Sequence, residues 1–323
     1  MKCGACGVEL RANARFCDMC GVKVDRRCPS CGGVIRDVAR FCDLCGKALT
    51  DAPAPVMPTH QAGIAAGRLH TVAWKSDGCV LACGDDQFGQ CRVEDWRDIV
   101  GCAAGKFHTV GVRADGRAVA IGDNAYGQCA VEDWTDLVAV ACGDNHTLGL
   151  RRDGTVLAAG RGGKCEVSGW TEIVAVAAGM DHSLGLRSDG SVVAAGEGMF
   201  GSCSVGGWTE ITAIAACHMH SLGLGKDGRL RAADAFAAPG IGTWEDLTAM
   251  AVSAFHTVGL RRDGCVLASG DTQYGQCSVE DWQGVQAVAV GERHTVGLRD
   301  DGAVVAVGDD GSGQCAVTEW KIS

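Results

Sequence analysis

The chain has 323 residues, a formal net charge of −10 and twenty cysteines. No apolar run approaches the ~18 residues that a membrane-spanning helix needs, and the first residues, MKCGACG, lack the apolar core of a signal peptide. We therefore expect neither a membrane protein nor a secreted one. Because thiols persist in reducing compartments, the many cysteines indicate a cytoplasmic protein.

The first fifty residues contain two copies of one cysteine pattern, at an offset of 25 residues. Each copy is a Cys-x2-Cys pair, ten residues, and a second such pair. Two such pairs offer four thiolates to one tetrahedral zinc, and a segment this short has too small a core to fold without a metal. The pattern resembles the double zinc-ribbon family. It predicts two zinc ions bound by Cys3, Cys6, Cys17, Cys20, Cys28, Cys31, Cys42 and Cys45.

The pairing of these ligands has two solutions. The internal copy favours one zinc per ribbon, whereas the alternative joins Cys17 and Cys20 with Cys28 and Cys31. In both solutions four thiolates surround each zinc and leave no position for water or substrate. The zinc ions are therefore expected to be structural rather than catalytic.

Residues 51–60 hold three of the chain's five prolines and are expected to form a stiff, extended linker between a 1–50 domain and a 61–323 domain. Residues 1–50 carry nine Lys and Arg against five Asp and Glu, a formal +4, which leaves −14 for the rest. Each four-thiolate zinc site adds about −2, which brings the ribbons close to neutral. An acidic second domain would also repel phosphates, so nucleic-acid binding is disfavoured.

Residues 61–323 repeat one unit seven times. Equivalent histidines are separated by 36 or 38 residues, and tryptophans and Asp-Gly pairs keep the same spacing. Short Val- and Ala-rich runs between Gly-containing turns are typical of antiparallel strands joined by hairpins, about four per unit. The repeated residues are His70, His108, His146, His182, His220, His256 and His294, with Trp96, Trp134, Trp170, Trp208, Trp244, Trp282 and Trp320.

The two ends of this array are complementary. The chain stops at Trp320-Lys321-Ile322-Ser323, just before the apolar run that follows the Trp in other units, and the array begins with such a run at residues 62–67. One small sheet cannot bury both of its faces, and a closed ring of sheets needs no capping repeats. The sequence therefore predicts an all-β fold, a seven-bladed β-propeller with a small N-terminal double zinc ribbon.

The segment VAVAAGMDHSLGLRSDGSVVAAGEGMFGSC, at residues 174–203, resembles the repeat of the regulator of chromosome condensation family. The resemblance covers about 260 residues and implies a propeller that acts by binding through its surface. Every unit keeps its length of 36 or 38 residues, so no blade carries the inserted wedge of the family's nucleotide-exchange factors. The residue before each repeated His is never Trp, in contrast to the family's photoreceptors.

Two segments of the unit vary along the chain, while the Asp-Gly turn is constant. Successive turns of an antiparallel blade alternate between faces, so the turn before the repeated His and the loop after the third strand should share one face. Variable aromatic, Met and Arg side chains suit a binding surface, and drift of solvated loops is the alternative. The predicted partner-binding residues are Leu69, Phe88, Phe107, Tyr126, Met180, Phe200, Met219, Phe236, Phe255, Tyr274 and Arg293.

The same turns and loops are acidic. Eleven acids stand against five bases there, which would steer a protein partner with a basic patch to this face. The acids are Asp85, Asp86, Asp123, Asp144, Asp181, Glu197, Asp234, Asp271, Glu292, Asp309 and Asp310, and the bases are Arg68, Lys106, Arg161, Lys164 and Arg293.

The repeated residues themselves have structural interpretations. A histidine present once per unit is expected to bond the adjacent backbone at a strand end, and the tryptophans to pack between blades. Six cysteines at one repeated position lie on different sheets, too far apart for disulfides, and are expected to be small buried residues. They are Cys91, Cys129, Cys165, Cys203, Cys277 and Cys315.

The sequence thus favours a monomeric, non-enzymatic interaction or regulatory protein, with a propeller face as the main contact and the zinc ribbons as a second one. Two alternatives stay open. The first is a nucleic-acid-associated regulator that uses the ribbons, which a steep salt dependence would reveal. The second is a propeller enzyme or small-ligand binder that uses the central channel, which would require perturbed acids in a polar pocket.

Overall fold

The computed structural model describes residues 26–27, 34–35, 61–233 and 238–322. The chain divides into two compact units, Met1–Met57 and Pro58–Ser323, which we describe separately. In the first, β1 (Arg26–Arg27) and β2 (Val34–Ile35) form an antiparallel pair. All eight predicted zinc ligands lie outside the described residues.

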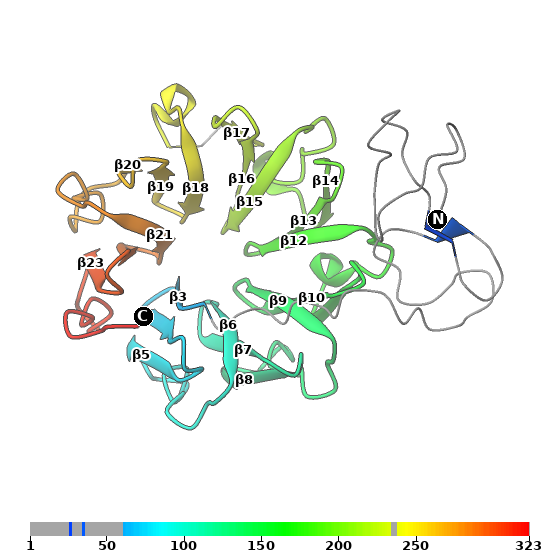
Figure 1. Ribbon diagram of the computed structural model, residues 1–323, viewed down its shortest axis with the longest axis horizontal. Helices are drawn as coiled ribbons and strands as arrows, with labels where there is room; N and C mark the ends of the chain where they lie inside the picture. The colour runs from blue at the N-terminus through cyan, green and yellow to red at the C-terminus, as the bar shows by residue number, and fades with distance from the viewer. Residues whose placement is uncertain (1–25, 28–33, 36–60, 234–237, 323) are drawn as a thin grey trace, which may run out of the picture. The chain divides into compact units, whose positions relative to one another are not determined.

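The second unit is built from seven antiparallel sheets of three strands, arranged as blades around a centre (Figure 1). We number the blades 1 to 7 in chain order. Blade 1 consists of β3 (Gly63–Ala66), β4 (His70–Trp74) and β5 (Val80–Gly84), blade 2 of β6 (Ile99–Ala104), β7 (His108–Arg113) and β8 (Ala118–Gly122), and blade 3 of β9 (Leu137–Cys142), β10 (His146–Arg151) and β11 (Val156–Gly160). Blade 4 consists of β12 (Ile173–Ala178), β13 (His182–Arg187) and β14 (Val192–Gly196), and blade 5 of β15 (Ile211–Cys217), β16 (His220–Gly225) and β17 (Leu230–Ala232). Blade 6 consists of β18 (Leu247–Val252), β19 (His256–Arg261) and β20 (Val266–Gly270), and blade 7 of β21 (Val285–Val290), β22 (His294–Arg299) and β23 (Val304–Gly308).

The only helices in the described part of the chain are three short 3-10 turns, η1 (Gly163–Cys165), η2 (Met199–Gly201) and η3 (Ile241–Thr243). None of the described segments forms a helix that is long and apolar enough to cross a lipid bilayer.

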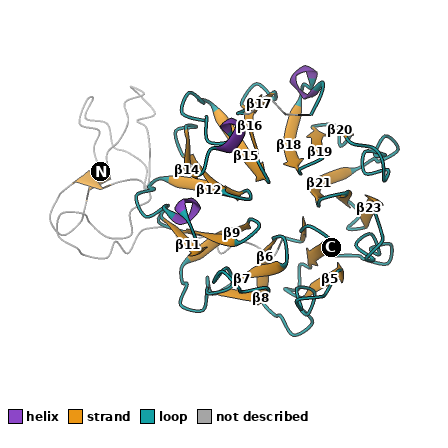
Figure 2. Cartoon of the chain, turned by 180° about the vertical axis from the view of Figure 1, so that it is seen from behind, coloured by secondary structure: helices purple, strands orange, loops and turns teal. Residues whose placement is uncertain are grey.

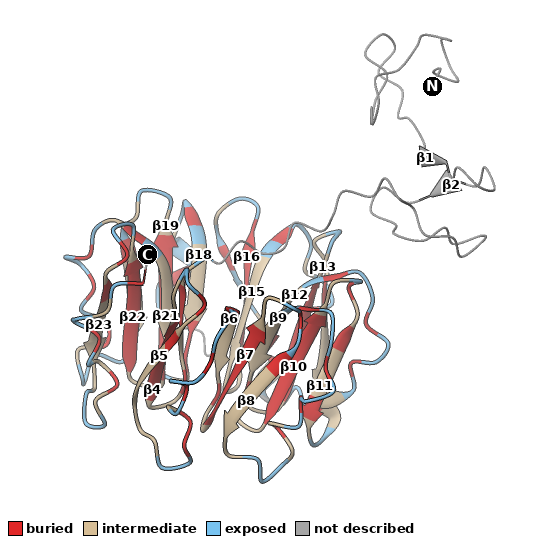
Figure 3. Cartoon of the chain, turned by 60° about the horizontal axis from the view of Figure 1, so that its bottom comes forward, coloured by how far each residue is buried: buried red, intermediate tan, exposed pale blue. Residues whose placement is uncertain are grey.

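The middle strand of each blade is its most buried element (Figure 3). In β7, the five residues His108–Val112 are all buried, because both faces of the sheet pack against neighbouring blades. The turn that follows is fixed by its Asp-Gly pair: the Asp115 carboxylate accepts a hydrogen bond from the Arg117 backbone, 3.0 Å away, and Gly116 adopts a φ of 83°. A left-handed φ favours glycine, which explains why this pair recurs in every blade.

The expectation of about four strands per unit was wrong: each described blade has three. The segment that carries the repeated Trp forms consecutive turns with local hydrogen bonds, such as Trp96 N to Val93 O at 3.0 Å, instead of a fourth strand. Its side chain anchors it instead. A Cβ added to Gly111 of the next blade would lie 2.8 Å from the Trp96 ring, so the glycine makes room for the tryptophan. The predicted packing of Trp between blades is confirmed.

The apolar core lies between blades rather than at the centre. One cluster contains Val72 and Val80 of blade 1, Trp96 and Val93 of the connecting segment, and Ile99 of blade 2. Equivalent clusters occur at the other junctions, so each blade buries its two faces only because it has two neighbours.

The ring closes where blade 7 meets blade 1, and β3 lies beside β21 in Figure 1. Among the described residues, no sheet contains strands from both ends of the propeller, so the ring is closed by side-chain packing and by hydrogen bonds such as that between His294 and Thr71. Ile322 is fully buried with Ile64 of β3 and Val304 of β23. Its backbone N–H donates to Gly302 O at 3.0 Å, as Ile99 N does to Gly78 O elsewhere in the ring. The C-terminal segment thus supplies the residue that the first blade lacks.

This closure predicts different effects for two N-terminal deletions. Removal of residues 1–58 should leave the propeller's thermal unfolding unchanged, because the whole of blade 1 is kept. Removal of residues 1–67 deletes β3 and should lower the unfolding temperature and cause aggregation, because it opens the ring and exposes strand edges. Calorimetry and gel filtration of both proteins provide the measurement. Equal unfolding temperatures would show that β3 does not seal the ring.

Candidate functional site

The two variable segments of each blade lie at the same end of the sheet. The third strand ends beside the turn that joins the first two, because Asp123 N donates to Phe107 O at 2.8 Å and Asp271 N to Phe255 O at 2.9 Å. The Asp-Gly turns lie at the other end of the strands. We call the end that carries the variable turns and loops the variable-turn face, and the other end the Asp-Gly face. The predicted sharing of one face by both variable segments is confirmed.

Beneath the variable-turn face, a ring of hydrogen bonds joins the blades. At least six of the seven repeated histidines contact, through Nε2, a Thr or Ser hydroxyl of the next blade at 2.8–3.0 Å. Sequence reasoning expected a backbone partner for these histidines, and that part was wrong, because the hydroxyl lies in the next blade. The pairs are His70–Thr109, His108–Thr147, His146–Ser183, His182–Ser221, His256–Thr295 and His294–Thr71.

The hydroxyls fix the protonation of these histidines. Thr109 donates its proton to Gln90 O at 2.8 Å, so its oxygen accepts the N–H of His70 Nε2. His70 Nδ1 is buried and has no hydrogen-bond partner among the described residues. A second proton there would be buried without an acceptor. Burial accordingly lowers the pKa of His70 to about 3 and that of His108 to about 4.

The turn before each histidine requires a small residue. A Cβ on Gly67 would lie 2.2 Å from the His70 ring, which explains the Gly of the repeated turn. Blade 6 has Ser253 at this position, and its hydroxyl lies 2.9 Å from His256 Nδ1. Blade 5 has Cys217, which pairs with His220 in the sheet and makes β15 one residue longer than the other first strands of six residues.

In blades 1 and 2, the loop after the third strand is held by an Asp and a buried Gln. In blade 1, Gln90 accepts the backbone N–H of Phe88 at 2.9 Å and donates to the Asp85 carboxylate at 2.9 Å. In blade 2, Gln128 makes the same two bonds, with Tyr126 and Asp123. This frame fixes the backbone of the loop and leaves the aromatic side chain at its tip facing solvent.

The predicted partner-binding residues lie on the variable-turn face as expected. Five are exposed: Phe88, Tyr126, Phe200, Phe255 and Tyr274, at 37–55%. Five others, Leu69, Phe107, Met180, Met219 and Arg293, are half-buried, and Phe236 lies outside the described residues. Every Phe and Tyr in the described part of the propeller belongs to a turn or loop of this face.

The structure joins some of these residues across blades, which the sequence did not predict. Phe88 of blade 1 and Phe107 of blade 2 have ring centroids 5.0 Å apart. Arg68 and Lys106 approach the Phe107 ring at 5.8 and 5.5 Å. Both cations are also paired with carboxylates, Arg68 with Glu292 and Lys106 with Asp144. We call these two phenylalanines the Phe88–Phe107 pair.

A second group lies on blades 6 and 7. The guanidinium of Arg293 lies 5.3 Å from the centroid of Phe255 and 4.9 Å from that of Tyr274. It also donates a hydrogen bond to the Tyr274 hydroxyl at 3.0 Å. We call these three residues the Arg293 group.

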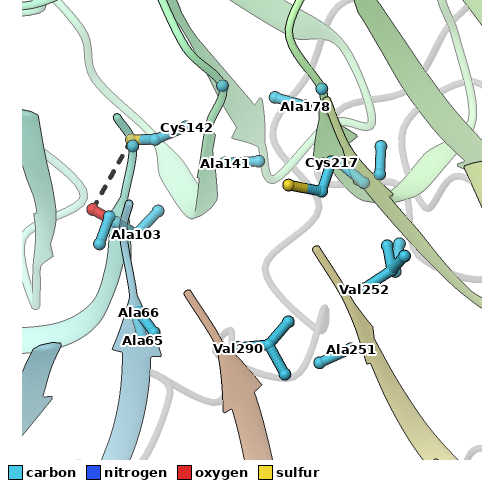
Figure 4. Close-up of a pocket in the computed structure, with 18 of the residues that line it drawn as sticks. Ala65, Ala66, Ala103, Ala141, Cys142, Ala178, Cys217, Ala251, Val252 and Val290 are labelled. Carbon is cyan, nitrogen blue, oxygen red and sulfur yellow. Dashed lines mark hydrogen bonds between the residues drawn. The ribbon is translucent and has the colours of Figure 1, made fainter. Parts of the chain in front are cut away.

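The first strands of the blades lie innermost in the ring (Figure 2), and their residues line a central channel. It contains a cavity of about 440 Å³, lined mainly by Ala, Val and Gly, with charged residues such as Arg68 and Asp144 at its mouth. Cys142 and Cys217 also face it (Figure 4). Burial raises the pKa of both thiols, that of Cys217 to about 12, so both are protonated at neutral pH. The twelve cysteines of the propeller form no disulfide.

Seven blades around a channel define a seven-bladed β-propeller. The regulator of chromosome condensation (RCC1) repeat matches residues 62–90, 99–128, 137–164, 173–201, 247–276 and 285–314. These segments make up more than half of the chain, which therefore belongs to the RCC1-repeat family. Blade 5, with its altered turn and short third strand, lies outside the six matches.

Solved structures show the same fold. The chain is similar to the ectodomain of the Physcomitrella patens receptor kinase CR4, with 21% identity, a TM-score of 0.63, and coverage of 76% of this chain and 72% of that one. It is also similar to the CRINKLY WD40 ectodomain of the Arabidopsis thaliana receptor kinase ACR4, with 22% identity, a TM-score of 0.61, and coverage of 76% and 97%. No curated protein sequence matches the chain significantly.

The double zinc ribbon family matches residues 3–46, which include all eight predicted ligands. Eight thiols in four Cys-x2-Cys pairs are a donor set that suits zinc. Among the described residues, no group of three or more His, Cys, Asp or Glu side chains converges as a metal site. The repeated histidines instead bond hydroxyls.

The histidine ring predicts a loss of stability in mild acid. Burial lowers the folded-state pKa of His70 and His146 to about 3 and that of His108, His256 and His294 to about 4, from 6.5. Below pH 6.5 the unfolded chain therefore binds protons that the folded chain does not. Each histidine should lower the free energy of unfolding by up to about 1.4 kcal/mol per pH unit, until the pH falls below the folded pKa.

Urea unfolding of the full chain between pH 7.5 and 5 measures this effect above the range in which carboxylates titrate. Stability should be full above pH 6.5 and fall steadily below it. A His108→Gln variant, with one buried titrating group fewer, should show a shallower slope. A free energy of unfolding that stays constant down to pH 5 would contradict the assignment of neutral histidines.

Proposed function

We propose that this protein is a non-enzymatic interaction protein, a scaffold or regulator, that binds a protein partner through its variable-turn face. One observation carries the proposal: every described Phe and Tyr of the propeller lies on that face, and five of them are exposed. Aromatic side chains supply much of the affinity of protein interfaces, and keeping them in solvent has a cost without a partner. The Asp-Gly face has no Phe or Tyr among its described residues.

Charge indicates the nature of the partner. Of the acids on the variable-turn face, Asp85, Asp123, Asp271 and Asp309 each accept a backbone N–H of their own loop and pair with no cation among the described residues. Asp271 is exposed and the other three are half-buried, so part of their charge reaches solvent around the rim while hydrogen bonds fix their positions. A protein with a basic patch would be steered to this rim and would neutralise it.

The channel supports a binding role better than a catalytic one. Its described lining is mainly Ala, Val and Gly, its carboxylates Asp144 and Glu292 are paired with Lys106 and Arg68, and the thiols of Cys142 and Cys217 are protonated at neutral pH. Small side chains there let the seven first strands approach each other closely.

The zinc ribbons would form a second contact, connected by the Pro-rich linker. We expect two structural zinc ions there, a cytoplasmic location that suits free thiols, and a monomeric propeller whose face stays available to another protein.

Metal analysis tests the ribbons. The purified chain should contain two zinc ions, and Cys17→Ser should lower this number, because a site with three thiolates binds zinc less tightly. Cys265→Ser is the matched control, because it removes an exposed propeller thiol and should leave the zinc content unchanged. A gentle preparation with fewer than two zinc ions per chain would contradict the predicted ligand set.

Alanine scanning tests the face, with a partner obtained by affinity purification on the full chain. Phe107→Ala and Tyr126→Ala should each weaken binding by ~1–3 kcal/mol, as for hot-spot aromatics, and leave thermal unfolding unchanged. Arg262→Ala on the Asp-Gly face is the control and should have little effect. Losses that cluster on the Asp-Gly face, or in residues 1–50 alone, would show that the wrong surface is assigned.

A further inference from the structure

Arg293 differs from three other cations of the variable-turn face. Arg68, Lys106 and Lys164 each pair with a carboxylate of a neighbouring blade: Glu292, Asp144 and Asp181. Arg293 has no carboxylate within ion-pairing distance among the described residues, although the face is rich in acids. Its position is nevertheless fixed, by two aromatic rings and by the Tyr274 hydroxyl.

The contacts of Arg293 use only part of its capacity. A guanidinium has five N–H donors, and here one terminal nitrogen donates to Tyr274 while Nε is buried without an acceptor. The remaining terminal N–H groups are held in a fixed plane between two aromatic side chains that are themselves exposed, Phe255 at 40% and Tyr274 at 37%. Such a guanidinium is already ordered, so a carboxylate that binds it does not have to immobilise a flexible side chain.

The surroundings restrict the ligand further. Asp271 and Asp309 lie in the loops of blades 6 and 7, beside Phe255 and Arg293, and would repel a strongly acidic segment. The Phe88–Phe107 pair lies beyond the Arg68–Glu292 ion pair on blades 1 and 2, and Phe88 is 44% exposed. A peptide segment that runs from blade 7 across blade 1 to blade 2 would thus contact the Arg293 group, then the Arg68–Glu292 ion pair, and then the Phe88–Phe107 pair. Acidic side chains would lie at the rim beside it.

Resting on the proposed function, we propose that the Arg293 group binds the carboxylate of one Asp or Glu side chain in an otherwise basic segment of the protein partner. An apolar side chain of the same segment packs on the Phe88–Phe107 pair, and its Lys or Arg residues meet the rim acids. The carboxylate sets the register of the segment, because Arg293 is the fixed cation of this arc without a carboxylate partner in the described structure.

A random dodecapeptide library displayed on phage and selected on the full chain provides the probe. Selected sequences should combine one Asp or Glu with basic and apolar residues. The best peptide, synthesised with blocked ends and measured by fluorescence anisotropy, should bind Arg293→Gln at least tenfold more weakly than the native chain. Replacing its acidic residue by the amide should cause a similar loss, and the two changes together should cause little more.

Arg161→Gln is the matched control, because Arg161 is an exposed cation of a blade 3 loop on the same face, also without a carboxylate partner among the described residues. It should bind the peptide like the native chain. Tyr274→Phe should lie between native and Arg293→Gln, because it removes the hydrogen bond and keeps the ring. Thermal unfolding of each variant verifies that the fold is intact.

The outcomes separate this inference from the proposed function. Suppose that the peptides bind Phe107→Ala weakly but bind Arg293→Gln like the native chain, or bind equally well when their acidic residue is replaced by the amide. That result would overturn the inference and would still support the variable-turn face as the binding surface. Peptides that are indifferent to both Phe107 and Arg293, or no enriched peptide at all, would count against the face itself. Peptides with blocks of acidic residues would show that the rim acids do not select the partner.

Discussion

The propeller depends on one contact, the hydrogen bond from a buried histidine to a hydroxyl of the next blade. No blade can bury both faces alone, and blades that only touched through apolar side chains could slide. The His–hydroxyl pair, extended from the hydroxyl to a backbone carbonyl, fixes the register of adjacent blades, including blade 7 on blade 1. Each bond is worth about 1 kcal/mol, but an unpaired partner in this dry layer would cost more. The intact ring is thus favoured because it pairs the buried polar groups at every junction between blades.

Features that depend on one repeat unit alone could be predicted from the sequence. The spacing of His, Trp and Asp-Gly gave the number of blades, and strand alternation gave the face on which the variable turns lie. Contacts between units could not be predicted, because they depend on how far one sheet is rotated against the next. The hydroxyl partner of His70, at Thr109 in blade 2, and the pairing of Phe88 with Phe107 belong to this class. The count of four strands failed for a related reason: the Trp segment has the length of a strand, but its hydrogen bonds are local turns.

Blade 5 shows what the repeat tolerates. Cys217 replaces the glycine that makes room for the histidine ring, and the turn residue His218 adopts a φ of 47°. Its third strand is shortened to Leu230–Ala232, yet Leu222 and Leu224 of β16 stay buried against blade 6. A ring of seven junctions keeps its geometry when one blade departs from the pattern, because its neighbours are fixed by their own contacts.

Stability and recognition are therefore carried by different atoms of the same loops. In the loop of blade 1, Asp85 and Gln90 hold the backbone, while the Phe88 ring takes no part in that frame, packs on Phe107 and stays exposed to a partner. The tip residue can change from Phe88 to Tyr126 between blades without loss of the Asp–Gln bonds. Arg293 is likewise an ordered side chain of this face, but neighbouring aromatic rings rather than a carboxylate fix its position. A rigid frame whose tip side chains are held by neighbouring rings presents ordered side chains to a partner at little entropic cost.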